Sequence, residues 1–132
     1  PEHMRWQHDG VLFVTLNFPG GDNNSGMPQE SAERTAAALA WMRQGFAQAR
    51  AQKAPGIVVL MQANPFLRSG NARRGYEALL AALAHETAGY SGQVLLGHFT
   101  RAEVFGSPDV NWLRVRVSEK GGRAVFAIST GR

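Results

Sequence analysis

The chain of 132 residues contains no cysteine. This absence excludes disulfide bonds, a thiolate nucleophile and a zinc site built on cysteine sulfur. It also removes the usual sequence clue to the redox compartment. A chain of this length can bury a sufficient hydrophobic core without cross-links, and its length corresponds to one domain.

Long apolar runs are absent as well. None approaches the roughly 20 apolar residues that a membrane-spanning helix needs, and the chain does not open with a signal-peptide pattern. We therefore expect a soluble protein without a membrane partner. The first four residues, Pro-Glu-His-Met, resemble the end of an expression-vector sequence. We assign residues 1–4 to such a remnant and residues 5–132 to a single α/β domain.

Lysine is scarce, and positive charge is not clustered. The net charge is +4, and Lys53 and Lys120 are the only lysines, so arginine supplies most of the positive charge. A nucleic-acid-binding domain usually gathers basic residues on one surface and places aromatic residues among them. Here the arginines are spread along the sequence, and Arg68, Arg73 and Arg74 are the nearest approach to a cluster. We expect no nucleic-acid partner.

The apolar residues that are present fall into short runs separated by two helical patterns. Residues 11–16, 57–61 and 93–96 are runs of the kind that suits strands covered on both faces. Between them, residues 28–53 and 71–88 show the three- and four-residue spacing of helices. The resulting β-α-β-α-β order predicts a parallel sheet with right-handed crossovers.

We expect residues 57–61 to form the central strand of this sheet, with residues 57–60 all buried. Ligands of open α/β sheets gather beside the carboxyl ends of the strands, which places Gln62 and Asn64 where a site would be expected. The competing interpretation is that these two side chains only end the strand and turn the chain. Their position does not decide between the two interpretations.

After residue 98 the pattern changes to antiparallel strands. Residues 102–105 are expected to form a short strand, and residues 111–118 alternate apolar and polar side chains, as a half-exposed strand does. The turn sequence of residues 119–122 predicts a hairpin with residues 123–130. The inward face of the return strand is expected to carry Ala124, Phe126 and Ile128. The predicted fold class is therefore α/β, a β-α-β-α-β core followed by an antiparallel β meander.

A glycine-rich loop lies between the first strand and the long helix. Its backbone N–H groups, together with the helix N-terminus, would suit a phosphate or another anion. However, the loop has no lysine or arginine and contains Asp22. The competing interpretation is a turn that uses glycine and asparagine for positive φ. The candidate anion-binding residues are Gly20, Gly21, Asn23, Asn24, Ser25 and Gly26.

Four stretches follow one another in an order that resembles a known family. They are Asp9-Gly-Val-Leu-Phe-Val-Thr-Leu-Asn17, Val58-Val-Leu-Met-Gln-Ala-Asn-Pro65, Val94-Leu-Leu-Gly-His98 and Val104-Phe-Gly-Ser-Pro-Asp-Val-Asn-Trp112. Together they resemble the C-terminal part of bacterial calcineurin-like metallophosphoesterases. The resemblance extends over nearly the whole chain and is most specific in residues 99–112. It implies half of an αββα sandwich.

The same resemblance implies a pair of divalent metal ions held by five motifs. Three of them, D-x-H, G-D and G-N-H-[DE], belong to an N-terminal half that this sequence does not include. The fourth is a histidine at a strand end, where this chain has Gln62. The fifth is G-H-x-H, which appears as Gly97-His98-Phe99-Thr100, with threonine in place of the second histidine. The connection between Leu96 and Phe99 is also shorter than in the family.

The candidate family-site positions are therefore Asn17, Gln62, Asn64 and His98, and His98 is the one candidate metal ligand. A two-metal phosphoesterase needs several histidine and carboxylate ligands to hold both ions and to generate hydroxide. We expect the isolated chain to bind no metal pair and to have no phosphatase activity. The other histidines, His3, His8 and His85, are expected to have surface or packing roles.

Three functions stay open at this point. The first is a fragment or remodelled domain of a metallophosphoesterase that serves folding or assembly. The second is a small anion-binding or assembly domain that uses residues 20–26. The third is a hydrolase completed by another chain. The corresponding partners are a second copy of the chain, a complementary chain or an N-terminal half. The bacterial resemblance would place the protein in the cytoplasm or the periplasm, without deciding between them.

Overall fold

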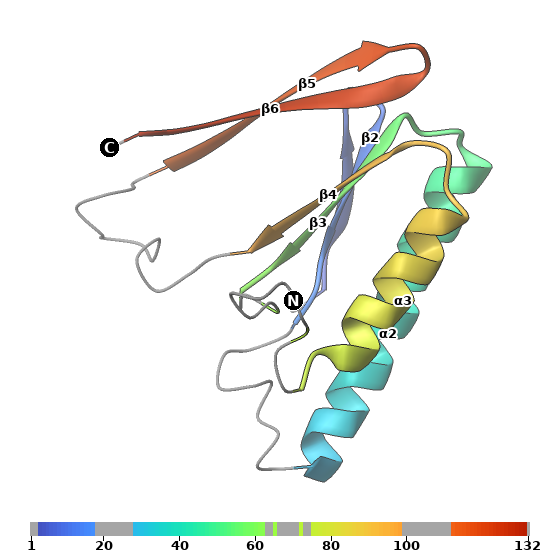
Figure 1. Ribbon diagram of the computed structural model, residues 1–132, viewed down its shortest axis with the longest axis vertical. Coiled ribbons are helices and arrows are strands. Elements are labelled where there is room, and N and C mark those ends of the chain that lie inside the picture. The colour runs from blue at the N-terminus through green and yellow to red at the C-terminus, as the bar shows by residue number, and fades with distance from the viewer. Residues whose placement is uncertain are drawn as a thin grey trace.

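The computed structural model describes residues 3–17, 28–62, 65, 72, 75–98 and 112–131. Within these residues it contains six strands and two helices. In chain order they are β1 (Arg5–His8), β2 (Val11–Thr15), α2 (Pro28–Ala51), β3 (Gly56–Met61), α3 (Glu77–Ala88), β4 (Gln93–His98), β5 (Trp112–Lys120) and β6 (Arg123–Gly131). One sheet has the order β1-β2-β3-β4, and β5 and β6 form a separate antiparallel pair (Figure 1).

The predicted β-α-β-α-β arrangement is confirmed. Strands β2, β3 and β4 are parallel, with α2 between β2 and β3 along the chain and α3 between β3 and β4. Strand β3 lies between β2 and β4, as expected for the central strand. No helix in the described part of the chain is long and apolar enough to cross a membrane. The strand predicted at residues 102–105 lies outside the described residues.

Strand β1 was not predicted from the sequence. It pairs antiparallel with β2 through a tight turn in which Asp9 and Gly10 have φ of 50° and 79°. Positive φ at both central residues is the requirement of a type I′ hairpin, which aspartate and glycine meet readily. The four residues of β1 show no apolar run because they form an edge of the sheet and are mostly exposed.

Both helices cover one face of the four-stranded sheet (Figure 1). The predicted stripe on α2 is confirmed, since Met42, Phe46 and Ala49 are fully buried against the sheet. From β3, Ile57 and Val59 enter the same core, and both are fully buried. This helix-covered face contains the main hydrophobic core of the protein.

An ion pair joins the two helices. Both terminal nitrogens of Arg50 lie within hydrogen-bonding distance of Oε1 of Glu86, at 3.2 and 3.3 Å. Glu86 is buried, so this contact satisfies a carboxylate that would otherwise be costly in the core. Helix α3 begins at Glu77, later than the predicted residue 71. The helix ends at Ala88, and the following Gly89 has a φ of −91°, so it does not adopt the left-handed conformation common after helices.

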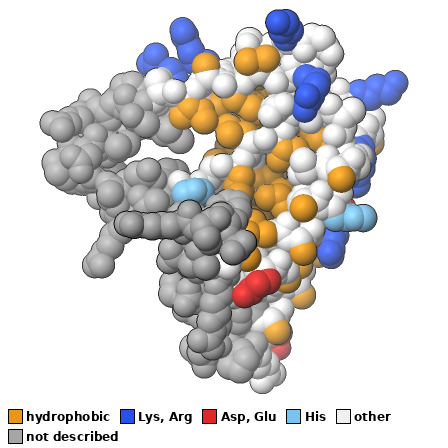
Figure 2. All heavy atoms as spheres, in the orientation of Figure 1, with side chains coloured by type: hydrophobic (Ala, Val, Ile, Leu, Met, Phe, Trp, Pro, Cys, Tyr) orange, Lys and Arg blue, Asp and Glu red, His pale blue; other side chains and the backbone are white. Residues whose placement is uncertain are grey.

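The hairpin β5-β6 covers the other face of the sheet only near the amino ends of its strands. There the N–H of Ala124 donates to the carbonyl of Pro55 at 2.7 Å, and Ala124 is 3% exposed. Farther along β6, Phe126 is half-buried and Ile128 is 54% exposed. Ile128 is thus on the predicted inward face of β6, but the sheet does not cover it. The reason is that the hairpin diverges from the sheet, and apolar side chains remain visible between hairpin and helices (Figure 2).

The expectation that residues 57–60 are all buried is correct for the first three and wrong for Leu60. Ile57, Val58 and Val59 are fully buried, whereas Leu60 is partly exposed. Leu60 packs on the hairpin side of the sheet, where the diverging hairpin leaves it partly uncovered. Exposure does not alternate along this run, so the parallel-sheet interpretation is confirmed.

The hairpin packs closely against the sheet at Gly56. A Cβ atom at this position would lie 2.6 Å from Cβ of Ala124 and 2.9 Å from Cζ of Phe126. We expect Gly56→Ala to displace the hairpin and to lower the free energy of unfolding by about 1–3 kcal/mol, as overpacking does. Urea denaturation measures this loss.

Gly89→Ala is the matched control for this substitution. Its Cβ atom would have no neighbour closer than 3.8 Å, and φ of −91° is allowed for alanine. We expect this control to be neutral or to stabilise the protein by about 0.4–1 kcal/mol through the unfolded state. Equal free energies of unfolding for the two variants would contradict close packing at Gly56.

Candidate functional site

The parallel strands bring three of the predicted site positions to the same edge of the sheet. Gln62 directly follows β3, and His98 is the last residue of β4, paired in register with Met61. Asn17 lies two residues beyond β2, and the N–H of the intervening Leu16 donates to the carbonyl of Leu60 at 2.8 Å. Ligands of such sheets bind beside this carboxyl edge. The structure thus places these side chains on three adjacent strand ends.

The surroundings of these side chains differ. Gln62 is exposed, whereas Asn17 and His98 are half-buried. Successive side chains of a strand alternate between faces, so His98 lies on the helix-covered face beside Met61, which is 3% exposed. The Nδ1 atom of His98 is itself buried and has no hydrogen-bond partner among the described residues. Sharing an edge therefore does not give Gln62 and His98 a common environment.

Two of the predicted site features fall outside the residues that the structure describes. These features are Asn64 and the candidate anion-binding loop of residues 20–26. The helix that follows the loop, α2, begins at Pro28 and carries Glu30 in its first turn. A carboxylate there complements the helix dipole and would compete with a bound anion. No described contact favours the anion-binding interpretation.

The donor set at the carboxyl edge does not fit a dinuclear metal centre. Among the described residues there is no group of three or more histidine, aspartate and glutamate side chains that could hold a metal ion. The three predicted site positions that the structure describes at the edge carry two amides and one imidazole. A metal-bound imidazole is normally oriented by a hydrogen bond from its other nitrogen. The described neighbours of His98 supply no such bond to Nδ1.

Of the remaining histidines, His3 precedes Met4, which bonds to Thr15 at the carboxyl end of β2, whereas His8 and His85 lie away from this edge. The ring of His3 stacks on Trp41 with centroids 6.0 Å apart, so a residue assigned to the vector remnant contacts the domain. His8 is exposed, with Nε2 at 3.2 Å from Oδ2 of Asp9, and His85 is exposed on α3. These positions agree with the predicted surface and packing roles.

Tyr90 occupies a buried polar position between the helices and the sheet. Its hydroxyl donates to the carbonyl of Ala54, and its ring meets Phe46 edge-on with centroids 5.9 Å apart. Burial raises the pKa of the Tyr90 phenol, while the positive charge of Arg123 partly opposes this effect. A phenol with a raised pKa stays protonated at neutral pH and can donate this hydrogen bond. Its arrangement fits a role in packing.

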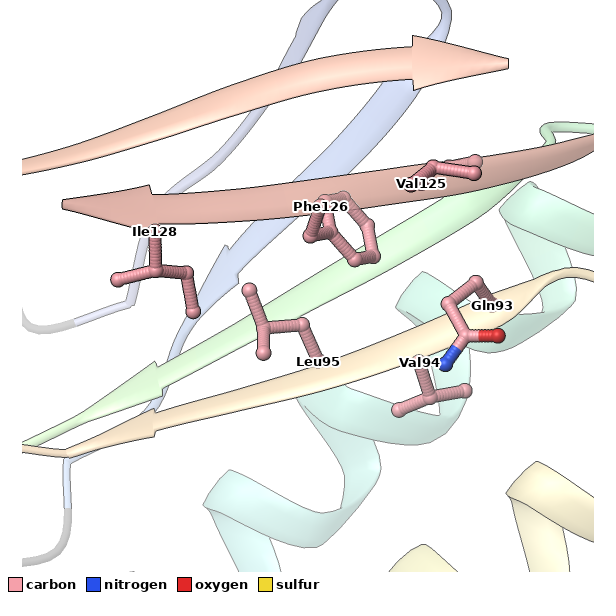
Figure 3. Close-up of a pocket in the computed structure, with 7 residues that line it drawn as sticks. Gln93, Val94, Leu95, Val125, Phe126 and Ile128 are labelled. Atoms are coloured by element: carbon pink, nitrogen blue, oxygen red, sulfur yellow. The ribbon is translucent and has the colours of Figure 1, made fainter. Parts of the chain in front are cut away.

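A hollow of about 310 Å³ lies between β4 and β6 and was not predicted from the sequence. Phe126 and Ile128 point from β6 toward β4, and Leu95 points from β4 toward them (Figure 3). Gln93 supplies a polar group at one end. Phe126 and Ile128 belong to the alternating apolar pattern of residues 123–130, which predicted the inward face of a strand and not an open hollow. The hollow exists because the hairpin diverges from the sheet.

Comparison with known proteins gives no match: no family model, no curated protein and no solved structure matches this chain. The resemblance to metallophosphoesterases consequently depends on the sequence stretches quoted above.

Proposed function

We propose that this chain is a fragment or remodelled domain of a calcineurin-like metallophosphoesterase that does not hydrolyse phosphate esters on its own. The observation that supports this proposal is the placement of Asn17, Gln62 and His98 on adjacent strand ends. Three of the four positions that the resemblance assigns to the family site thus lie on neighbouring strand ends. The side chains that occupy them are two amides and one imidazole.

The side chains at this edge differ from the metal ligands that an active phosphoesterase site needs. Two-metal hydrolysis needs ions that activate a water molecule and neutralise charge on the phosphoryl oxygens. Carboxylates and several imidazoles provide the affinity and geometry for those ions, whereas an amide is a weaker ligand for transition metals. Gln62 therefore places a weak amide ligand where the resemblance expects a histidine. The single imidazole of His98 would hold a transition-metal ion only weakly. The role that remains is in folding or assembly.

Hydrolysis assays test this proposal directly. We expect the purified chain to hydrolyse an aryl phosphate monoester and an aryl phosphate diester no faster than buffer containing the same concentration of manganese. Calorimetric titration with manganese is expected to show no saturable binding. Manganese-dependent turnover that disappears in His98→Ala but not in His85→Ala would overturn the proposal. His85 is the control because it is exposed on α3.

A second candidate is a hydrolase completed by another chain, and the accessibility of Gln62 favours it. This side chain is exposed at the carboxyl edge, so a second protein bearing the missing ligands would reach it. Such a site requires His98 to act as a ligand. Manganese is paramagnetic and would then selectively broaden the imidazole NMR signals of His98, leaving those of His85 sharp. Equal, weak broadening of both histidines would remove the support for His98 as a ligand in this chain.

A further inference from the structure

We propose that the free edge of β4 is a self-association surface, which pairs antiparallel with β4 of a second copy and joins the two four-stranded sheets into one. This proposal does not depend on the metallophosphoesterase resemblance. Three observations carry it: the direction of the backbone hydrogen-bonding groups, the composition of the strand, and the apolar hollow beside it.

The first observation concerns the backbone groups of β4. On one side β4 pairs with β3, and on the other side no strand lies beside it in the part of the chain that the structure describes. The N–H of Gln93 donates to the carbonyl of Pro55 at 3.0 Å. Hydrogen-bonding groups alternate in direction along a strand, so those of Leu95 face β3. Those of Val94 and Leu96 consequently point to the free edge.

The second observation is that the sequence of β4 contains none of the usual protective features of an edge strand. Natural edge strands avoid unwanted pairing by being short, by carrying charge or proline, or by bulging. Strand β4 has six residues, Gln-Val-Leu-Leu-Gly-His, without lysine, arginine, aspartate, glutamate or proline, and all six are partly exposed. The opposite edge of the same sheet, β1, has four residues and begins with Arg5. The two edge strands, β1 and β4, therefore differ in length and in charge.

The third observation is the hollow between β4 and β6. It adjoins β4 and is lined by Leu95, Phe126 and Ile128, of which Ile128 is 54% exposed. Strand addition obtains affinity from main-chain hydrogen bonds and specificity from pockets that receive alternate side chains. A strand added to β4 would place every second side chain on the hairpin side, next to this hollow. The edge and the hollow therefore form one surface.

A second copy of β4 fits this surface better than a charged partner strand would. The whole chain has a net charge of +4, so two copies repel each other in general, but β4 carries no lysine, arginine, aspartate or glutamate. Antiparallel pairing about a two-fold axis near Leu95 and Leu96 places apolar side chains of the two copies opposite each other. Leu95 contributes to the hairpin side of the joined sheet, and Val94 and Leu96 contribute to the helix-covered side. The two-fold symmetry also repeats each contact.

The first experiment measures mass in solution. By analytical ultracentrifugation across a dilution series, we expect the chain to reach twice its mass of 14.3 kDa at high concentration. In Leu96→Pro the proline removes an N–H that points to the free edge, so the β3-β4 ladder stays intact while pairing is blocked. We expect this variant to stay at the mass of one chain, with a circular dichroism spectrum like that of the unmodified chain.

The matched control is Gln7→Pro on the opposite edge. The N–H of Thr15 donates to the carbonyl of Met4 at 2.9 Å, and the alternation from that bond along β1 turns the N–H of Gln7 outward. This variant should dimerise as the unmodified chain does. An unmodified chain that stays at the mass of one copy would overturn the proposal. A folded Leu96→Pro variant that still dimerises would overturn it as well.

Cross-linking provides a second measurement if Leu96→Pro does not fold. The sequence has no cysteine, so a single introduced thiol reports only pairing between copies. Residues directly opposite each other in antiparallel strands have Cβ atoms about 4.5–5.5 Å apart, close enough for a disulfide after small adjustments. We expect Leu95→Cys or Leu96→Cys to form a covalent dimer under mild oxidation, and Gln7→Cys to stay monomeric. A dimeric protein that cross-links at neither β4 position would place the interface elsewhere.

Discussion

Val59→Asp is expected to lower the free energy of unfolding by several kcal/mol, enough to unfold much of the protein at neutral pH. Val59 is fully buried in β3, between β2 and β4, and faces the helix-covered core. A carboxylate placed there loses its hydration and gains no partner charge, so the charged form is strongly disfavoured. Native stabilities of about 5–15 kcal/mol leave little margin for such a loss.

The loss is expected to depend on pH in a definite direction. Burial raises the pKa of the introduced carboxyl in the folded state above its unfolded value of about 3.9. Below that unfolded pKa the carboxyl is protonated in both states, and the cost comes only from burying a polar group. As the pH rises above about 4, the unfolded state releases the proton first, so stability falls further until the folded pKa is reached. Urea denaturation at pH 4 and pH 7 measures the difference.

Val125→Asp is the matched control for this prediction. Val125 lies on β6 and is 45% exposed, so a carboxylate there keeps most of its water. We expect a loss below about 1 kcal/mol, as for most exposed substitutions, with little dependence on pH between 4 and 7. If Val59→Asp were as stable as Val125→Asp, the helices would not cover this face of β3 in solution.

Phe46→Ala is expected to cost about 3–5 kcal/mol, the range measured for removing a buried aromatic ring. Phe46 is fully buried on the sheet-facing side of α2, and its ring meets Tyr90 edge-on. Removing the ring opens a cavity between α2 and the sheet, and it also withdraws lateral support from Tyr90. The midpoint of urea denaturation should fall with an unchanged slope, because the folded state stays compact.

Phe126→Ala removes the same ring from a less covered position. Phe126 is half-buried on the sheet-facing side of β6, so less apolar area returns to water and the surroundings relax more easily. We expect a clearly smaller loss than for Phe46→Ala. Equal losses would show that the hairpin packs more tightly on the sheet than its exposure indicates.

The order and type of the main elements could be predicted from the sequence. The spacing of apolar residues along the chain indicates which of them are buried. Two examples are the run at residues 57–61 and the helical stripe that contains Met42 and Phe46. Parallel pairing followed from the alternation of strands and helices. That pairing placed Gln62 and Asn64 beside the carboxyl edge, and the structure confirms the position of Gln62. These features were predictable because periodicity is set by which face of each element is covered.

The local environment of the candidate site was not predictable in the same way. The sequence marked His98 as a potential ligand, but the buried Nδ1 atom of its ring depends on how β4 lies against the helix-covered face. Strand β1 was missed because its side chains face mostly solvent and give no apolar signal. Both features arise from contacts between segments distant along the chain.

The sequence by itself determined an α/β domain with a buried central strand, because one-dimensional spacing records how much of each face is covered. Only the tertiary structure decided that the hairpin covers one end of the sheet and leaves Ile128 and the hollow beside Leu95 open. It also decided that β4 is an edge strand among the described strands, since strand order depends on long-range pairing. The sequence pattern of an apolar strand is the same at an edge as in the middle of a sheet. The side chains depend on whether the two faces are covered, whereas pairing at the edge uses only backbone groups.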